Sequence, residues 1–281
     1  MNNNSISYDE IMISLCLSML IYNYNENEFF IIQENNSLRD FYKFIDFHFD
    51  IYQREALTYL YNKCPDGKIV TFIDDAETDI QCCIISLDIN KTLNIVFRGT
   101  DSITDCIYDS LFCKTYLELN NDNIIGVHTG FYTQFEYIYN KIIHIIEKYI
   151  NLDYNIYITG HSLAHSLSVL LSYFIADLTK KKIKTITFGG PKIGNDKWKE
   201  NYDSKQNLIL YRIINDADLV TIIPHIDYVH VGIPIYISKE DISFENNNKC
   251  YYTINDHSIV NYYNNFFGKE KIYSNLINKN N

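Results

Sequence analysis

The chain has 281 residues, a formal net charge of −11 at pH 7 and 47% hydrophobic residues. This length suits one large domain, and the hydrophobic content is ample for a substantial core. The negative charge argues against a nucleic-acid partner, whose phosphates require a basic face, and provides no attraction to an anionic membrane surface.

The N-terminal segment combines acidic residues with a short apolar run. Ile11–Tyr22 is too short to span a bilayer and lacks the basic flank of a secretory signal peptide, so we predict a packed helix over Tyr8–Tyr22. Seven cysteines lie mostly in apolar segments, without a Cys-x-x-Cys pair that would support a metal site. We therefore expect reduced, buried thiols in an intracellular (cytoplasmic) protein. The Asn-, Ile- and Lys-rich composition is typical of AT-rich coding, which fits a virus or an intracellular parasite acting in a host cell.

The first third of the chain reads as a helical region followed by strands. Residues 1 to about 65 form an N-terminal helical region, with a second helical segment at Leu38–Tyr61. Pro65-Asp66-Gly67 predicts a turn, and short β-branched runs after it predict strands. These strands are Lys68–Ile73, Cys82–Asp88 and Thr92–Phe97. Residues 101–113 are predicted to form a short amphipathic surface helix.

The remaining two thirds alternate between helical and strand patterns. One apolar stripe predicts a long helix over Phe131–Ile150, and a buried strand ends at Gly160-His161-Ser162 before a helix that reaches Leu178. Further strands are predicted at Lys184–Phe188, Leu208–Ile214, Tyr228–Ile237 and Lys249–Ile254, followed by a terminal helix at His257–Phe267. The alternation predicts an α/β fold with a mainly parallel central sheet, helices on both faces and antiparallel edge strands. We expect residues 1–281 to form a single domain.

Ser162 lies at the apex of the central strand–turn–helix. Such a turn exposes the serine hydroxyl and directs the next backbone N–H and the helix N-terminus toward a developing oxyanion. It matches the nucleophile elbow Gly-x-Ser-x-Gly, except that Ala164 replaces the second glycine. A helix-capping serine is the structural alternative, because serine often begins a helix after a strand.

A serine nucleophile requires a base and an acid that orients the base. Asp218 and His257 follow later strands, in the order Ser, Asp, His that is typical of hydrolases of this architecture. Asp216 is the alternative acid. His230 is more simply interpreted as a core histidine than as the base.

Seven sequence blocks occur together in a fixed order between about residues 70 and 265. They are Ile95–Thr100, Val127–Phe131, Thr159–Leu163, Thr187–Asn195, Arg212–Val220, Tyr228–Gly232 and Asp256-His257. Each block is weak alone, but in this order they resemble the class 3, fungal-type lipases, which have the α/β-hydrolase fold.

The resemblance implies a role for each matched residue. Ser162 would be the nucleophile, His257 the general base and then acid, and Asp218 the residue that orients it. The backbone N–H groups of Thr100 and Leu163 would form the oxyanion hole. No metal or organic cofactor is implied.

The resemblance also implies a lid over the site. Residues 101–113 would form it, with Ile103 and Ile107 on the apolar face that turns toward lipid. Asp109 would buttress the Thr100 hydroxyl.

These features predict an ester hydrolase that acts on lipids, first of all on triacylglycerols or other acylglycerols, at a lipid–water interface. A phospholipase A1, a short-chain esterase and acyl transfer to an acceptor other than water remain open within this class. The rival is a lipase-like binding or signalling module without useful catalysis. Its support is Ala164-His165, where the family has Gly-Gly; His165 would either point outward from the helix or narrow the acyl pocket.

Overall fold

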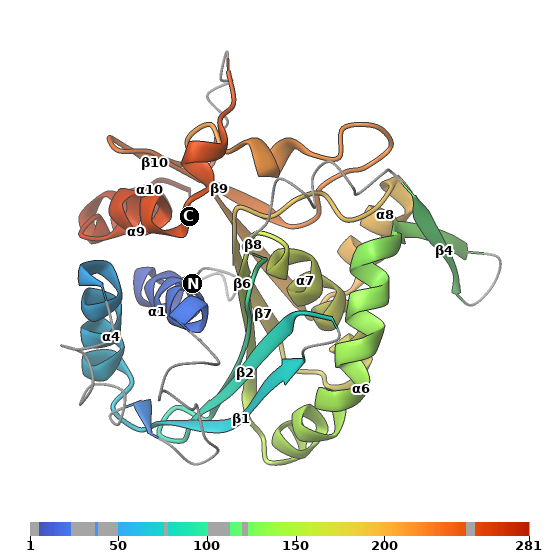
Figure 1. Cartoon of the computed structure of the whole chain (residues 1–281), viewed down its shortest axis with the longest axis horizontal. Helices are drawn as coiled ribbons and strands as arrows, with labels where there is room; N and C mark the ends of the chain where they lie inside the picture. The colour runs from blue at the N-terminus through green and yellow to red at the C-terminus, as the bar shows by residue number, and fades with distance from the viewer. Residues whose placement is uncertain are drawn as a thin grey trace.

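The computed structural model contains one large sheet and a separate hairpin (Figure 1). It describes residues 6–23, 37–38, 50–75, 78–100, 113–119, 123–245 and 251–280. The large sheet has eight strands in the order β1-β2-β3-β6-β7-β8-β9-β10, and β4 pairs with β5. The strands are β1 Gly67–Asp75, β2 Ile80–Leu87, β3 Thr92–Phe97, β4 Lys114–Leu119, β5 Asn123–His128, β6 Asn155–His161, β7 Ile183–Phe188, β8 Leu208–Asn215, β9 Ile233–Ile237 and β10 Ile242–Ser243.

The centre of the large sheet is parallel and its two edges are antiparallel. β3, β6, β7, β8 and β9 run parallel to one another, whereas β1–β2–β3 and β9–β10 pair in the antiparallel sense. Parallel strands buried on both faces read as nearly continuous apolar runs. For this reason the sequence alone predicts β3, β6, β7 and β8. The predicted α/β architecture is confirmed.

Helices cover both faces of the sheet (Figure 1). One face carries α1 Tyr8–Leu20, α4 Ile51–Lys63, α9 Ile259–Phe266 and α10 Glu270–Asn280. The other carries α6 Thr129–Asn151, α7 Ala164–Ile175 and α8 Asp196–Ser204. The sheet therefore separates two hydrophobic cores, and the carboxyl ends of its parallel strands share one edge.

The N-terminal helix α1 is bound to the sheet by polar as well as apolar contacts. Ser7 and Glu10 form a capping box that begins the helix. Ser18 Oγ lies 3.1 Å from Thr159 Oγ1 of β6, and Tyr157 donates a hydrogen bond of 2.6 Å to Glu10. These contacts bring the segment after α1, a short 3₁₀ helix η1 (Ile21–Asn23), close to the end of β6.

Two predicted strands are wrong or shorter than expected. Only Ile233–Ile237 of Tyr228–Ile237 is a strand, because the Val229 N–H bonds to Gly194 O in a loop at 2.8 Å and not to β8. Residues 251–253 are not a strand, and Ile254–His257 forms a 3₁₀ turn, η4. Residues 246–250 lie outside the described residues. Of the predicted helix Leu38–Tyr61, residues 39–49 lie outside the described residues; helix α4 begins at Ile51, with Asp50 as its N-cap.

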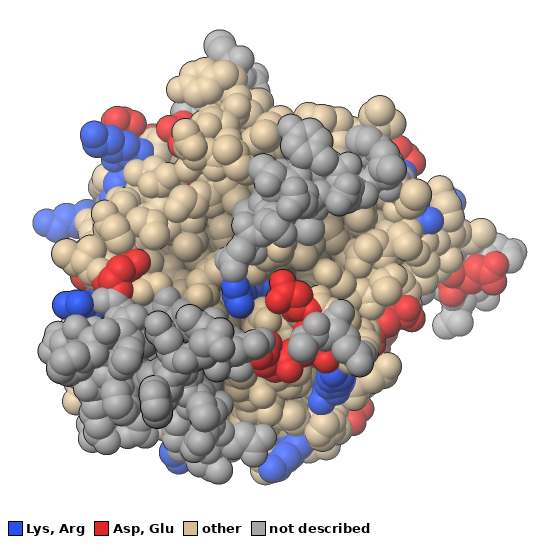
Figure 2. Space-filling model, in the orientation of Figure 1, with Lys and Arg blue, Asp and Glu red and all other residues tan. Residues whose placement is uncertain are grey.

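Charged side chains are dispersed over the face shown in Figure 2. Acidic side chains gather near its centre, while lysine and arginine lie scattered around them. Among the described residues, no group of three or more His, Cys, Asp or Glu side chains could hold a metal ion. In the same part of the chain, every helix is too short or too polar to cross a membrane.

Candidate active site

Ser162 occupies a strained turn between β6 and α7. Its φ of +62° lies in the left-handed region, which is uncommon for a residue with a side chain, and its N–H bonds to Phe188 O at 2.9 Å. The turn is tight because strand and helix nearly touch. A Cβ built on Gly160 would lie 2.5 Å from the Cβ of Ala164. Ser162 therefore has the backbone of a nucleophile elbow and not that of a simple helix cap.

The two departures from Gly-Gly are accommodated inside the protein. Ala164 is fully buried against Gly160, where its small side chain fits. His165 is only 1% exposed, and its Nδ1 lies 2.8 Å from Thr187 Oγ1 of β7. A Cβ on Gly190 would come within 2.0 Å of His165 Cγ, so the ring packs directly against that glycine. The expectation that His165 points outward is wrong.

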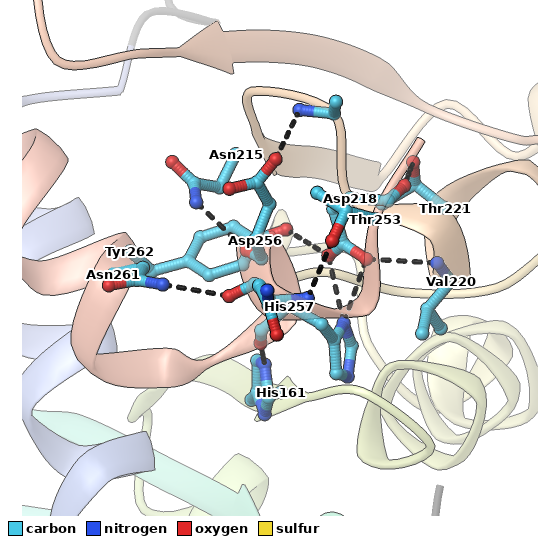
Figure 3. Close-up of polar contacts among 12 residues, drawn as sticks. His161, Asn215, Asp218, Val220, Thr221, Thr253, Asp256, His257, Asn261 and Tyr262 are labelled. Carbon is cyan, nitrogen blue, oxygen red and sulfur yellow. Dashed lines mark hydrogen bonds and ion pairs between the residues drawn. The ribbon is translucent and has the colours of Figure 1, made fainter. Parts of the chain in front are cut away.

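His257 and Asp218 form a buried pair at the carboxyl edge of the sheet (Figure 3). His257 Nδ1 lies 2.8 and 3.0 Å from the two carboxylate oxygens of Asp218. Because a carboxylate only accepts hydrogen bonds, the proton of the neutral ring is on Nδ1 and the lone pair is on Nε2. Nε2 is buried without a hydrogen-bond partner among the described residues. The pair thus presents a base that is free to take a proton.

The Asp218 carboxylate has two further donors. Tyr262 Oη donates to Oδ2 at 2.6 Å, and the Val220 N–H donates to Oδ1 at 2.9 Å. Burial, reinforced by the neighbouring Asp218 charge, raises the pKa of Tyr262 well above its usual value, so the phenol stays protonated. Tyr262 lies in α9 and was not identified from sequence, since nothing local distinguishes it among 25 tyrosines.

The turn that carries His257 is fixed to the end of β8. Thr253 N–H bonds to Ala217 O at 2.8 Å, and Asn215 Nδ2 bonds to Asp256 O at 2.8 Å. Asp256 Oδ2 accepts the Ala217 N–H at 3.3 Å. These contacts (Figure 3) hold the base opposite its acid without the strand that the sequence predicted.

The nucleophile and the base lie on either side of the end of β7. Ser162 N–H bonds to Phe188 O, and a Cβ on the next residue, Gly189, would lie 3.0 Å from the His257 ring and 2.8 Å from Asp218 Oδ2. Gly189 has φ +61°, so both its conformation and its neighbours require glycine. The His161 ring, one residue before Ser162, lies 4.5 Å from the His257 ring.

The end of β3 reaches the same place. A Cβ on Gly99 would lie 3.2 Å from Ser162 Cβ, which puts the half-buried Thr100 beside the nucleophile. Leu163 follows Ser162 and is the N-cap of α7, at the helix end whose backbone N–H groups have no partner within the helix. Both predicted oxyanion residues are thus next to Ser162. Asp109, Ile103 and Ile107, with the predicted lid up to residue 112, lie outside the described residues.

The alternative acid and base occupy other positions. Asp216 is half-buried at φ +40°, whereas Asp218 is fully buried against His257. His230 Nε2 lies 2.6 Å from Thr221 O and therefore donates to it. Burial lowers the pKa of His230 well below 6.5, so this histidine stays neutral.

A second group of polar side chains, which includes His165, lies around Arg212. Arg212 is 7% exposed and donates Nε–H to Val231 O at 2.8 Å; burial lowers its pKa to about 10. Burial, with Arg212 nearby, lowers the pKa of His165 to about 3, and it also lowers the pKa of Lys192. Among the described residues, no carboxylate forms an ion pair with Arg212. We refer to Arg212, Lys192, His165 and His230 as the basic cluster.

The arrangement is suited to acyl transfer through a serine. It combines a serine at a strained strand–helix turn, a buried imidazole whose Nε2 has no partner among the described residues, an acid that orients the imidazole, and backbone N–H groups beside the serine.

Comparisons with known proteins show sequence similarity to lipases. Residues 94–228 match the family model for lipase (class 3). A lipase from Rhizopus niveus is 26% identical over 183 residues, which cover 62% of this chain and 46% of the relative. A phospholipase A1-IIdelta from Arabidopsis thaliana is 32% identical over 109 residues, 37% of this chain and 26% of the relative. The chain thus spans about half the length, or less, of the curated relatives it matches.

The fold is also found among solved structures. A triacylglyceride lipase from Rhizomucor miehei superposes with a TM-score of 0.66 at 17% identity, over 90% of this chain and 94% of that one.

Proposed function

We propose that this chain, whose residues 94–228 match the class 3 lipase family, is a serine carboxylic-ester hydrolase acting on lipids. The observation that carries the proposal is the buried His257–Asp218 pair. Its Nε2 has no partner among the described residues, and its ring packs against Gly189, the residue after the Phe188 carbonyl that accepts the Ser162 N–H. A histidine in this state is poised to deprotonate a serine hydroxyl.

In the proposed reaction, Ser162 Oγ attacks the ester carbonyl while His257 Nε2 takes its proton. The charge that develops on the carbonyl oxygen is stabilised by the N–H groups of Leu163 and Thr100. The intermediate collapses to an acyl-serine, and the alcohol leaves with the proton from His257. Water, deprotonated by the same nitrogen, then releases the fatty acid and restores Ser162. The Asp218 carboxylate stabilises the imidazolium in both steps.

Acylglycerols are the substrate class that we favour. The relatives include a fungal lipase and a triacylglyceride lipase structure, and the net charge of −11 disfavours anionic lipid surfaces. Phospholipid is the second candidate, supported by the similarity to a plant phospholipase A1. Pocket shape decides between the two.

The binding-module alternative rested on His165. The His165 side chain packs against Gly190 and forms a hydrogen bond with Thr187, and the His257–Asp218 pair is intact. The elbow keeps its left-handed serine despite the change. We therefore favour the enzyme.

Hydrolysis of p-nitrophenyl esters from acetate to palmitate, with and without lipid vesicles, tests the proposal. Ser162→Ala and His257→Ala should abolish activity, whereas Ser204→Ala and His144→Ala, both exposed and remote in sequence, serve as matched controls. Preference for long chains and activation by vesicles would support a lipase, and activity on short chains alone would support an esterase. Wild-type turnover no higher than that of folded Ser162→Ala would refute the enzyme.

A further inference from the structure

Two side chains outside the proposed catalytic set connect the N-terminal segment to the base. Tyr22, in η1 after helix α1, places its hydroxyl 2.9 Å from His161 Nδ1. His161 Nε2 lies 2.7 Å from the backbone oxygen of His257. The second contact is drawn in Figure 3, where the His161 ring lies directly below the turn that carries His257.

The direction of each hydrogen bond follows from chemistry. A backbone carbonyl only accepts, so His161 must carry its proton on Nε2 and donate to His257 O. His161 is 4% exposed, and burial lowers its pKa well below 6.5, with His257 adding to the effect. The ring is therefore neutral, and Nδ1 must accept from the Tyr22 O–H. The order is Tyr22 O–H to His161, then His161 N–H to His257 C=O.

The same two residues also border the nucleophile. A Cβ on Gly99 would lie 2.3 Å from the Tyr22 hydroxyl, 2.5 Å from His161 O and 3.2 Å from Ser162 Cβ. Tyr22 and His161 therefore surround the residue before Thr100, which we place in the oxyanion hole. The rings of His161 and His257 are in contact at 4.5 Å between centroids.

We propose that Tyr22 and His161 are positioning residues for the catalytic base. Asp218 fixes the imidazole of His257 from one side, while the Tyr22–His161 relay fixes its backbone from the other. The relay also sets the His161 tautomer, since only the Nε2–H form can hold the carbonyl. The inference rests on the proposed function, because it assigns these residues a role in the His257-dependent step.

A double-mutant cycle tests the relay. Tyr22→Phe should lower kcat for p-nitrophenyl butyrate about 5- to 10-fold with KM unchanged, as expected for the loss of one buried hydrogen bond. His161→Leu should lower kcat by about 100-fold, and His161→Gln, which keeps a donor near His257 O, should recover much of this loss. In the His161→Leu background, Tyr22→Phe should have no further effect, because Tyr22 acts only through Nδ1.

Tyr273→Phe is the matched control. Its hydroxyl also ties a tyrosine to the N-terminal segment, by a 2.9 Å bond to Ile6 O, but it does not touch the active site. Inactivation by diethyl p-nitrophenyl phosphate gives a second readout, since it reports Ser162 reactivity without a lipid substrate. Equal losses in Tyr22→Phe and Tyr273→Phe, or additive effects of Tyr22→Phe and His161→Leu, would overturn the relay.

Nuclear magnetic resonance of ¹⁵N-histidine provides a test that does not depend on turnover. His161 should remain uncharged at pH 6 with its proton on Nε2, and its Nδ1 signal should shift in Tyr22→Phe. A His161 that is protonated on Nδ1, or that titrates near 6.5, would overturn the inference. A wild type no more active than Ser162→Ala would refute the proposed function alone, and the tautomer would still decide the relay.

Discussion

Two groups of buried or half-buried polar side chains lie on segments next to the Ser162 turn, and they differ in whether a carboxylate is present. On one side His257 faces the Asp218 carboxylate, which also accepts from Tyr262. On the other side lies the basic cluster of Arg212, Lys192, His165 and His230, where no carboxylate among the described residues pairs with the arginine. A buried imidazole without an acid is held neutral and fixed, so it supports the structure. A buried imidazole paired with a carboxylate can accept a proton, so it can act as a base.

The largest expected effect comes from removing the acid that distinguishes the two sides. Asp218→Asn should lower kcat by about 10³- to 10⁴-fold, because the amide no longer selects the Nδ1–H tautomer or stabilises the imidazolium. The measurement is kcat and KM for p-nitrophenyl butyrate. Asp216→Asn is the matched control, since asparagine tolerates the φ of +40° at that position. Similar losses in the two variants would contradict the assignment of the acid.

The packing of the basic cluster can be tested at Gly190, which contacts the His165 ring. Gly190→Ala should reduce the free energy of unfolding by about 2 kcal/mol or more, because the new Cβ would meet the His165 ring at 2.0 Å. Urea unfolding measures the loss. Adding His165→Ala to Gly190→Ala should restore part of the stability. A double variant no more stable than Gly190→Ala would show that the clash lies elsewhere.

Tyr262→Phe sharpens the comparison on the acid side. It should lower kcat about 10-fold, the effect expected for one lost hydrogen bond to a charged group, while the fold is retained. Tyr202→Phe, which removes a buried hydroxyl bonded to Ser172 on the other face of the sheet, is the control. An equal change in kcat for Tyr262→Phe and Tyr202→Phe would contradict a role for Tyr262 in supporting Asp218.

The neutral histidines predict a pH dependence of stability. Burial lowers the pKa of His165 from 6.5 to about 3 in the folded protein, so the unfolded chain binds more protons between these values. The free energy of unfolding should therefore fall as pH falls from 6.5 toward 3, by roughly 1 kcal/mol per pH unit for this residue. His165→Asn, which can still bond Thr187, should have a shallower slope in urea unfolding at pH 7, 6 and 5. An unchanged slope would mean that other groups carry the effect.

Local patterns in the sequence predicted the parallel core and the strands β1 and β2 well, but they predicted the segments after β8 poorly. β3, β6, β7 and β8 are apolar runs bounded by turn residues, so burial on both faces is written into each segment. Residues 251–257 are also rich in β-branched and aromatic side chains, yet they form a turn. Their backbone bonds are made to Ala217 and Leu219 and not to a neighbouring strand.

By itself, the sequence determined the architecture and the identity of Ser162, Asp218 and His257 as candidates, because the spacing of strands and the order of motifs are properties of the chain. Only the tertiary structure decided which side chains support them. Tyr262, Tyr22 and His165 act across contacts between segments distant in sequence, and Tyr22 lies 139 positions from the His161 it binds. Whether a buried histidine is a base or a packing residue depends on the charges that surround it, and folding alone brings those charges together.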